Sequence, residues 1–345
     1  MTLCKVLAGT CRGLGRWAMP LAALGLLAGC GKGPAELPEG CAFGEDVPAS
    51  VRSAVEDAAS RFYEHARKGE AQAIYEEAAP VVREKNSPEQ FLAPIAHTAR
   101  QLGFPPLTTR SLATIRFGGQ TPYQHRLECN EPGKEALTTF LLLDHPEQAS
   151  LVQVGDVGGE TFNYSTVWFR EEGGGWRIAA FFVRPATIFG KGSAAYAEEA
   201  AAQREQGNLR NAALLYNIAI DLAVPAVWIK PAEVEILQRQ QRRITVSDLP
   251  ADRLVVWAAP PDSFRVYSIA YTILSDGLGL LVRYEAPGAM SDTLAQAAYG
   301  DRLVRYMEKK FPEYRSVFRY LGLEGREGRD RDKVWMRTYP LEPGP

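Results

Sequence analysis

The apolar periodicity of the chain changes near residue 110, and this change restricts the fold more than any other feature. Before it, apolar residues recur at intervals of four, three and four, the spacing of one helix face: Val51, Val55, Ala58 and Phe62. After it, apolar residues alternate with polar ones, which predicts β-strands. Helices followed by strands favour an α+β fold in which the helices cover a sheet.

Capping and turn residues delimit the predicted elements. One helix ends at Gly69, a second covers 71–79, and a third begins at Ser87 with the capping pattern Ser-Pro-Glu-Gln. Strands are predicted over 111–117, 123–129, 136–143, 161–170 and 176–183. Glycines at 173–175 join the last two as a hairpin. Alternate residues of the two strands of this hairpin are expected to form one shared, mostly apolar face: Phe162, Tyr164, Thr166, Trp168, Trp176, Ile178, Ala180 and Phe182.

Residues 46–190 resemble an NTF2-like domain. The resemblance rests on a Phe, Lys-Gly-Glu and Ile-Tyr passage at 62–75, on Ser-Pro-Glu-Gln-Phe at 87–91, and on a closing Gly-Trp-Arg-Ile strand at 175–178. It implies a cone in which three helices lie on a curved antiparallel sheet, often around a pocket. Members of this family include enzymes, ligand binders and assembly modules, so the fold alone assigns no function.

Residues 191–243 are predicted to form a helical hairpin followed by a helix that starts at Trp228. The spacing of small and aromatic residues resembles a single tetratricopeptide repeat, although Glu199 stands where Leu is usual. The residues that carry this resemblance are Tyr196, Ala200, Gly207, Ala212, Tyr216, Ala219 and Pro225. A generic αα-hairpin is the alternative, because a single repeat cannot bury its own core.

Residues 244–345 are predicted to form a small α+β unit. Its expected strands cover 253–258, 264–274 and 278–285. A helix then begins at Ser291 or Asp292 and is interrupted by Pro312, and 334–339 are expected to return as a last strand.

The first 29 residues have the pattern of a secretion signal, because basic residues precede an uncharged run over 17–31 that is too short to span a bilayer. The run contains Leu27-Ala28-Gly29-Cys30, which resembles the bacterial lipobox. The resemblance implies that Cys30 is lipidated and is the first residue of the mature protein. It would then begin a lipidated tether over 30–45. An ordinary signal peptide, or an apolar leader with an accidental Cys, is the alternative.

The residues after Cys30 bear on localisation. Gly31 and Lys32 follow it, so the Asp that commonly retains bacterial lipoproteins at the inner membrane is absent. The resemblance therefore implies an outer-membrane lipoprotein that faces the periplasm, with the inner membrane as the less favoured alternative. We expect the membrane, through the N-terminal lipid, and an envelope protein as partners.

Cys41 and Cys129 are the cysteines left once the signal is removed and Cys30 is lipidated. In an oxidising periplasm such a pair can form a disulfide. Two separate buried thiols are the alternative, because the sequence does not show whether their Cα atoms approach.

Composition and motifs exclude several functions. The chain has 39 basic and 41 acidic side chains, a formal net charge of −2 and no basic block, so we expect no nucleic-acid partner. Its four histidines do not have zinc-site spacing. The sequence also lacks a nucleophile elbow, a phosphate-binding loop and a dinucleotide fingerprint. We therefore predict no metal, no cofactor and no catalytic residue.

Two functions are compatible with these patterns. The preferred one is non-catalytic binding or assembly through the outer surface of the hairpin: Arg204, Asn208, Arg210 and Asn211. The alternative is an NTF2-like pocket that binds or transforms a small ligand, with His65 as base because it extends the apolar helix face. The other candidate pocket residues are Tyr63, Tyr123, His125, Tyr164 and Trp168.

Overall fold

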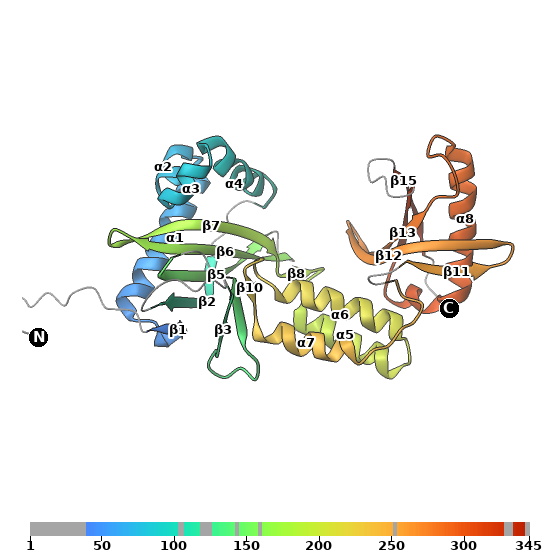
Figure 1. Ribbon diagram of the computed structural model, residues 1–345, viewed down its shortest axis with the longest axis horizontal. Coiled ribbons are helices and arrows are strands. Elements are labelled where there is room, and N and C mark those ends of the chain that lie inside the picture. The colour runs from blue at the N-terminus through green and yellow to red at the C-terminus, as the bar shows by residue number, and fades with distance from the viewer. Residues whose placement is uncertain are drawn as a thin grey trace, which may run out of the picture. The chain divides into compact units, whose positions relative to one another are not determined.

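The computed structural model describes residues 39–102, 107–117, 126–141, 145–157, 161–250, 254–327 and 334–341. In these residues the chain is α+β, with mostly antiparallel sheets (Figure 1). The leader, Cys30 and most of the tether lie outside the described residues, as do Tyr123 and His125. None of the described helices combines the length and the apolar character needed to cross a membrane.

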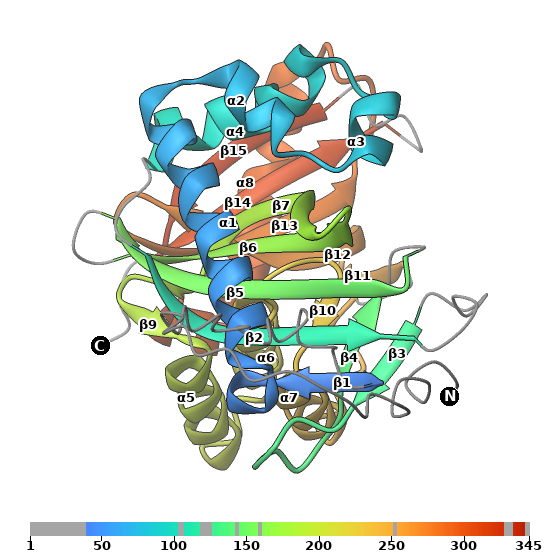
Figure 2. The same cartoon turned by 90° about the vertical axis from the view of Figure 1, so that its left-hand side faces the viewer.

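The N-terminal part contains an antiparallel sheet with strand order β1-β2-β5-β6-β7. Its strands are β1 (Gly40–Phe43), β2 (Leu107–Arg116), β5 (Glu147–Val157), β6 (Thr161–Glu172) and β7 (Gly175–Pro185). The helices of this part are α1 (Ala49–Lys68), α2 (Ala71–Glu76), α3 (Pro80–Lys85) and α4 (Pro88–Leu102). Figure 2 shows α1 lying across the strands, so this helix covers one face of the sheet.

The α1 face of the sheet is closely packed. Val55 and Phe62 from α1 and Val167 and Phe169 from β6 are fully buried in this layer. The helix ends at Gly69, whose φ of +68° suits glycine because the left-handed region strains a residue with a Cβ. The apolar helix face expected from the sequence is therefore confirmed.

The opposite face packs against a second, smaller sheet with strand order β10-β4-β3. Its strands are β3 (Arg126–Cys129), β4 (Thr138–Leu141) and β10 (Ile229–Lys230). Ile229 pairs with Phe140, so the chain returns to the N-terminal part after the helical hairpin. Phe140 and Trp168 are buried in the core between these two sheets.

The hairpin consists of α5 (Ser193–Glu205) and α6 (Leu209–Ala223), preceded by β8 (Thr187–Ile188) and β9 (Lys191–Gly192) and followed by α7 (Ala232–Arg242). The residues expected to face across it are buried, among them Tyr196, Ala200 and Tyr216. Gly207 has a φ of +82° in the turn, where the sequence places the junction.

The C-terminal sheet has strand order β11-β12-β13-β14-β15. Its elements are β11 (Val255–Ala259), β12 (Asp262–Leu274), β13 (Gly277–Glu285), α8 (Thr293–Lys310), a 3-10 helix (Pro312–Ser316), β14 (Tyr320–Arg326) and β15 (Val334–Pro340). β13 and β14 are parallel, because α8 carries the chain back before β14 begins. Buried residues of the hairpin and of this sheet belong to one apolar core, among them Leu222 and Leu280.

Several strands were not expected from the sequence: β1, which lies within the predicted tether, β5, β8, β9, β10 and β14. Of these, β5 and β14 are central strands with neighbours on two sides. A strand buried on both faces loses the apolar and polar alternation, as the consecutive buried residues Leu151 and Val152 show. The structure also adds α3 to the three expected helices, and α7 begins at Ala232 rather than at Trp228.

The expectation of one apolar face along the β6–β7 hairpin is wrong. The register shifts between Trp168, which pairs with Ala180, and Phe169, which pairs with Ile178. Ala179 is therefore an extra residue, a β-bulge that reverses which side chains of β7 face α1. Ile178 lies in the α1 core, whereas Ala180 lies in the core of the opposite face.

Candidate ligand-binding pocket

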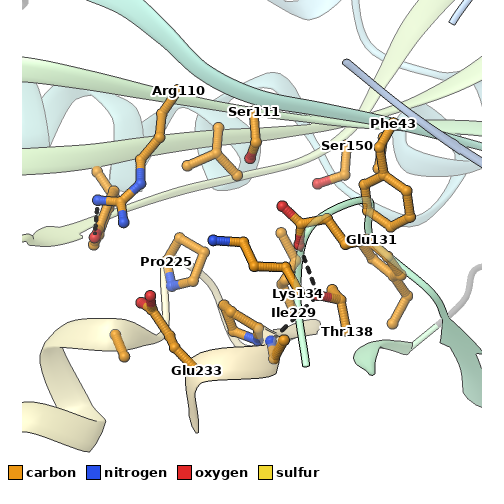
Figure 3. A pocket seen from close by; sticks show the side chains of 17 residues that line it. Phe43, Arg110, Ser111, Glu131, Lys134, Thr138, Ser150, Pro225, Ile229 and Glu233 are labelled. Carbon is orange, nitrogen blue, oxygen red and sulfur yellow. Dashed lines mark hydrogen bonds between the residues drawn. The ribbon is translucent and has the colours of Figure 1, made fainter. Parts of the chain in front are cut away.

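Two adjoining cavities lie on the side of the N-terminal sheet that faces away from α1. The first, of about 150 Å³, is lined by residues of β2, β5 and β6, of the β3–β4 connection, and of 223–233 (Figure 3). The second, of about 560 Å³, is lined by parts of α5 and α7 and by the β8–β9 region. Arg110, Tyr164 and Glu233 line both, so the two cavities share a border.

Arg110 enters the first cavity because β2 contains a β-bulge. Thr109 pairs with Gln153 and Ser111 with Val152, which leaves Arg110 as an extra residue. In a regular strand Arg110 would share a face with Leu112, which packs in the α1 core. The bulge re-aims its side chain, so Arg110 and Ser111 both line the cavity (Figure 3).

Tyr164 holds the Arg110 guanidinium at the border between the cavities. Arg110 Nη1 donates a hydrogen bond of 2.5 Å to Tyr164 Oη, and the guanidinium carbon lies 5.0 Å from the centroid of the ring. Burial raises the pKa of the Tyr164 phenol, and the positive charge of Arg110 opposes this effect. Tyr164 is therefore a neutral hydroxyl at physiological pH and can donate its own proton to a further acceptor.

Charged groups of both signs line the first cavity: Arg110, Lys134, Glu131 and Glu233. The amine of Lys134 and the carboxylate of Glu233 point into it (Figure 3). Glu131 Oε2 accepts a hydrogen bond of 2.9 Å from Thr138 Oγ1. No ion pair joins any two of these four described side chains, although they surround one small space.

Ser150, on β5, contributes an unsatisfied hydroxyl to the first cavity. The residue is 2% exposed, and its Oγ has no hydrogen-bond partner among the described residues. Leaving a buried hydroxyl unpaired costs about 1–3 kcal/mol. A ligand that accepts or donates a hydrogen bond here would recover that free energy.

The segment after the hairpin closes the cavity by hydrogen bonds to both sheets. Thr166 Oγ1 donates to the Pro225 carbonyl at 3.2 Å, and Leu141 N donates to the Trp228 carbonyl at 2.9 Å. Ala232 N donates to Thr138 Oγ1 at 3.2 Å. Apolar walls complete the enclosure: Phe43, Phe140, Val152, Pro225 and Ile229.

The structure does not bring the predicted pocket residues together. Tyr63 lies on the α1 face, with Oη 2.5 Å from Ser165 Oγ, and burial raises its pKa. Tyr164 is adjacent to Ser165 in β6. Side chains of adjacent strand residues point to opposite faces of a sheet, so Tyr164 points away from α1. Trp168 is fully buried and donates a hydrogen bond of 3.0 Å from Nε1 to Gln148 Oε1. Of the predicted residues that the structure describes, Tyr164 lines the two cavities.

The structure places His65, the predicted pocket base, outside both cavities. Its Nδ1 lies 2.6 Å from Glu70 Oε2 at the end of α1. The apolar face that His65 was expected to extend packs in the α1 core, where Val55 and Phe62 are fully buried.

The predicted partner surface of the hairpin is largely internal. Arg210 forms ion pairs with Asp248 and Glu313. Asn211 is fully buried and donates from Nδ2 to Gln203 Oε1 at 3.0 Å and to the Glu313 carbonyl at 2.6 Å. Asn208 Nδ2 donates to the same Gln203 oxygen at 3.0 Å. Arg204 makes none of these contacts. Arg210 and Asn211 therefore hold the hairpin to the rest of the chain, and a buried amide such as that of Asn211 must find its partners internally.

Cys41 and Cys129 form a disulfide, with their Cα atoms 6.0 Å apart. The bond joins β1 to β3 and so connects the two sheets beside the pocket. Among the described residues, no group of three or more His, Cys, Asp or Glu side chains is arranged to hold a metal ion.

The sequence did not single out Arg110, Ser111, Lys134, Ser150 or Glu233. These residues come from separate segments and form no local motif. Arg110 also lies one residue before the predicted strand 111–117, so the sequence offered no signal for its role.

No family model matches this chain, and no curated protein and no solved structure matches it either.

Proposed function

We propose that this chain is a lipid-anchored envelope protein that binds a small ligand in the first cavity without converting it. One observation carries the proposal: a β-bulge directs Arg110 into a partly open cavity that the unsatisfied hydroxyl of Ser150 also lines. Small-ligand sites combine apolar walls with a few convergent polar groups, and this cavity has both. We also assign residues 46–190 to an NTF2-like domain, on the sequence resemblance and on the long helix that covers an antiparallel sheet.

Binding is favoured over catalysis by the identity of the lining residues. A serine nucleophile needs a base within hydrogen-bond reach, and Ser150 has no such neighbour among the described residues. His65 is held by Glu70 outside both cavities. The lining groups are suited to holding a charged ligand rather than to activating a nucleophile.

Lipidation of Cys30 would keep the pocket at the membrane surface. We propose the periplasmic side of the outer membrane, on the residues that follow Cys30. Arg204 and neighbouring exposed residues of the hairpin are the proposed contact with an envelope protein.

The test uses the dialysable small-molecule fraction of an envelope extract. This fraction should raise the melting temperature of the purified full chain, because a ligand that binds only the folded state stabilises it. Ser111→Phe fills the first cavity and should abolish the increase. Thr108→Phe, an exposed position of the same strand outside both cavities, is the matched control and should behave as the unmodified protein.

Two results would contradict the proposal. One is a melting temperature that no dialysable fraction raises. The other is an equal increase in Ser111→Phe and the unmodified protein, which would place binding elsewhere in the molecule.

A further inference from the structure

We infer that the ligand is a zwitterion of the amino-acid class, with an apolar side chain and with its ammonium and carboxylate groups both free. The inference rests on the proposed binding function and specifies its ligand. It comes from the charges, the hydroxyls and the shape of the first cavity.

The four charged groups of this cavity are balanced but not paired with one another. Arg110 and Lys134 are cationic, and Glu131 and Glu233 are anionic. Arg110 and Lys134 are exposed and Glu131 and Glu233 are half-buried, so a bound ligand could replace the water around each of these charges. No ion pair joins them here. A ligand that carries one charge of each sign would supply both missing counter-charges.

The carboxylate end of such a ligand fits the side of the cavity at Arg110, Lys134 and Ser150. One nitrogen of Arg110 is bonded to Tyr164, which orients the guanidinium and leaves other N–H groups to donate. Lys134 adds a second positive charge that points into the cavity (Figure 3). The hydroxyl of Ser150 can donate to the same carboxylate, and this bond would satisfy it.

The ammonium end fits Glu233. Glu131 already accepts a hydrogen bond from Thr138, whereas the Glu233 carboxylate points into the cavity and has no such bond within the described residues. Glu233 lies at the start of α7, and Pro231 and Ala232 beside it also line the cavity. A simple anion would supply no counter-charge to Glu233. A simple cation would supply none to Arg110 and Lys134.

The remaining surface suits an apolar side chain. Phe43, Phe140 and Ile229 line the first cavity. Beyond the Arg110, Tyr164 and Glu233 border, the second cavity offers further apolar contacts. A side chain too long for the first cavity can therefore extend into the second.

The first experiment compares derivatives of one ligand. The proteinogenic L-amino acids are titrated singly into the purified full chain by calorimetry, and the tightest binder is then compared with its N-acetyl and amide derivatives. The N-acetyl form lacks the ammonium group and the amide lacks the carboxylate. Each should bind at least about tenfold more weakly, since it loses the hydrogen bonds to a charged group at one end of the ligand.

The second experiment assigns each end of the ligand to its residue. Glu233→Gln should weaken the free amino acid about tenfold or more but leave the weak affinity of the N-acetyl form unchanged. Lys134→Met should weaken the free amino acid and leave the amide unchanged. The matched controls are Glu198→Gln and Lys309→Met, which change exposed residues outside both cavities. Circular dichroism checks that every variant is folded.

The outcomes separate this inference from the proposed function. Equal affinity for the parent and either derivative would overturn the zwitterion, and so would the absence of binding by every amino acid. If Ser111→Phe still abolishes the thermal shift with the dialysable fraction, the pocket binds a different class of ligand and the proposed function stands. If that shift is also absent, both proposals fail together.

Discussion

Arg210, in the first turn of α6, donates two hydrogen bonds to the carboxylate of Asp248, of 3.1 and 2.5 Å. A third bond of 2.9 Å reaches Glu313. The guanidinium carbon also lies 4.6 Å from the centroid of the Phe311 ring. One side chain therefore links the hairpin to the segment after α7 and to the segment after α8, using the planar fork that distinguishes Arg from Lys.

Replacing Arg210 with Ala should lower the free energy of unfolding by about 1–3 kcal/mol, because it leaves two partly buried carboxylates without their donor. Urea denaturation monitored by circular dichroism measures the change. Arg204→Ala, on the preceding helix, should stay within about 0.5 kcal/mol of the unmodified protein. Equal effects of the two substitutions would refute the structural role of Arg210.

The disulfide between Cys41 and Cys129 should contribute to stability, because it closes a loop across 88 residues. The double variant Cys41→Ser, Cys129→Ser should lose about 2–5 kcal/mol of unfolding free energy. The double variant is preferred to a single one because it leaves no unpaired thiol. A thiol titration of the denatured, unreduced mature protein should detect no free thiol, and finding two would contradict the bond.

Cys30→Ala should release the protein from the membrane, because the variant lacks the residue that the lipobox resemblance marks for acylation. Detergent partitioning, membrane fractionation and the intact mass report the change. The unmodified protein should show the added mass of its acyl chains. Unchanged partitioning in the variant, or an unmodified mass in the parent, would rule out lipidation at Cys30.

Tyr196 should make stability depend on alkaline pH. Burial raises its pKa from 10.0 to about 12, and its Oη donates a hydrogen bond of 3.1 Å to the Ile188 carbonyl. Because the pKa is higher in the folded than in the unfolded state, this contribution is fully present below pH 10.0 and is lost as the pH rises towards about 12.

Urea denaturation at a series of alkaline pH values tests this dependence. Tyr196→Phe should lose about 1 kcal/mol near neutral pH, from the missing hydrogen bond, and should show a shallower decline above the pKa of free tyrosine. Other buried tyrosines, such as Tyr63, preserve part of the slope. An identical slope in the variant and the unmodified protein would exclude Tyr196 as a source of the pH dependence.

The α+β class and most helices could be predicted from the sequence, because these features depend on local periodicity and capping. The apolar face of α1 and its end at Gly69 are examples, since both follow from residues within a few turns of one another. The hairpin of α5 and α6 was predictable for the same reason. Two of the missed strands, β5 and β14, are central strands, whose sequence resembles no alternating pattern because both of their faces are buried.

The pocket could not be predicted in this way. In a regular strand Arg110 would face α1, and only its pairing with a distant strand reveals the bulge that turns it. The hairpin residues Arg210 and Asn211 have the polar character of an exposed surface. In the structure, however, Arg210 donates a hydrogen bond to Asp248 and Asn211 donates one to the Glu313 carbonyl.

By itself, then, the sequence determined what most of the helices and many of the strands would be, because local propensity and hydrophobic period act over a few residues. The tertiary structure decided which side chains meet, because strand register and long-range polar pairing depend on segments far apart in the chain. The NTF2-like resemblance placed Tyr63 and Tyr164 in one predicted pocket, and the structure places them on opposite faces of the sheet.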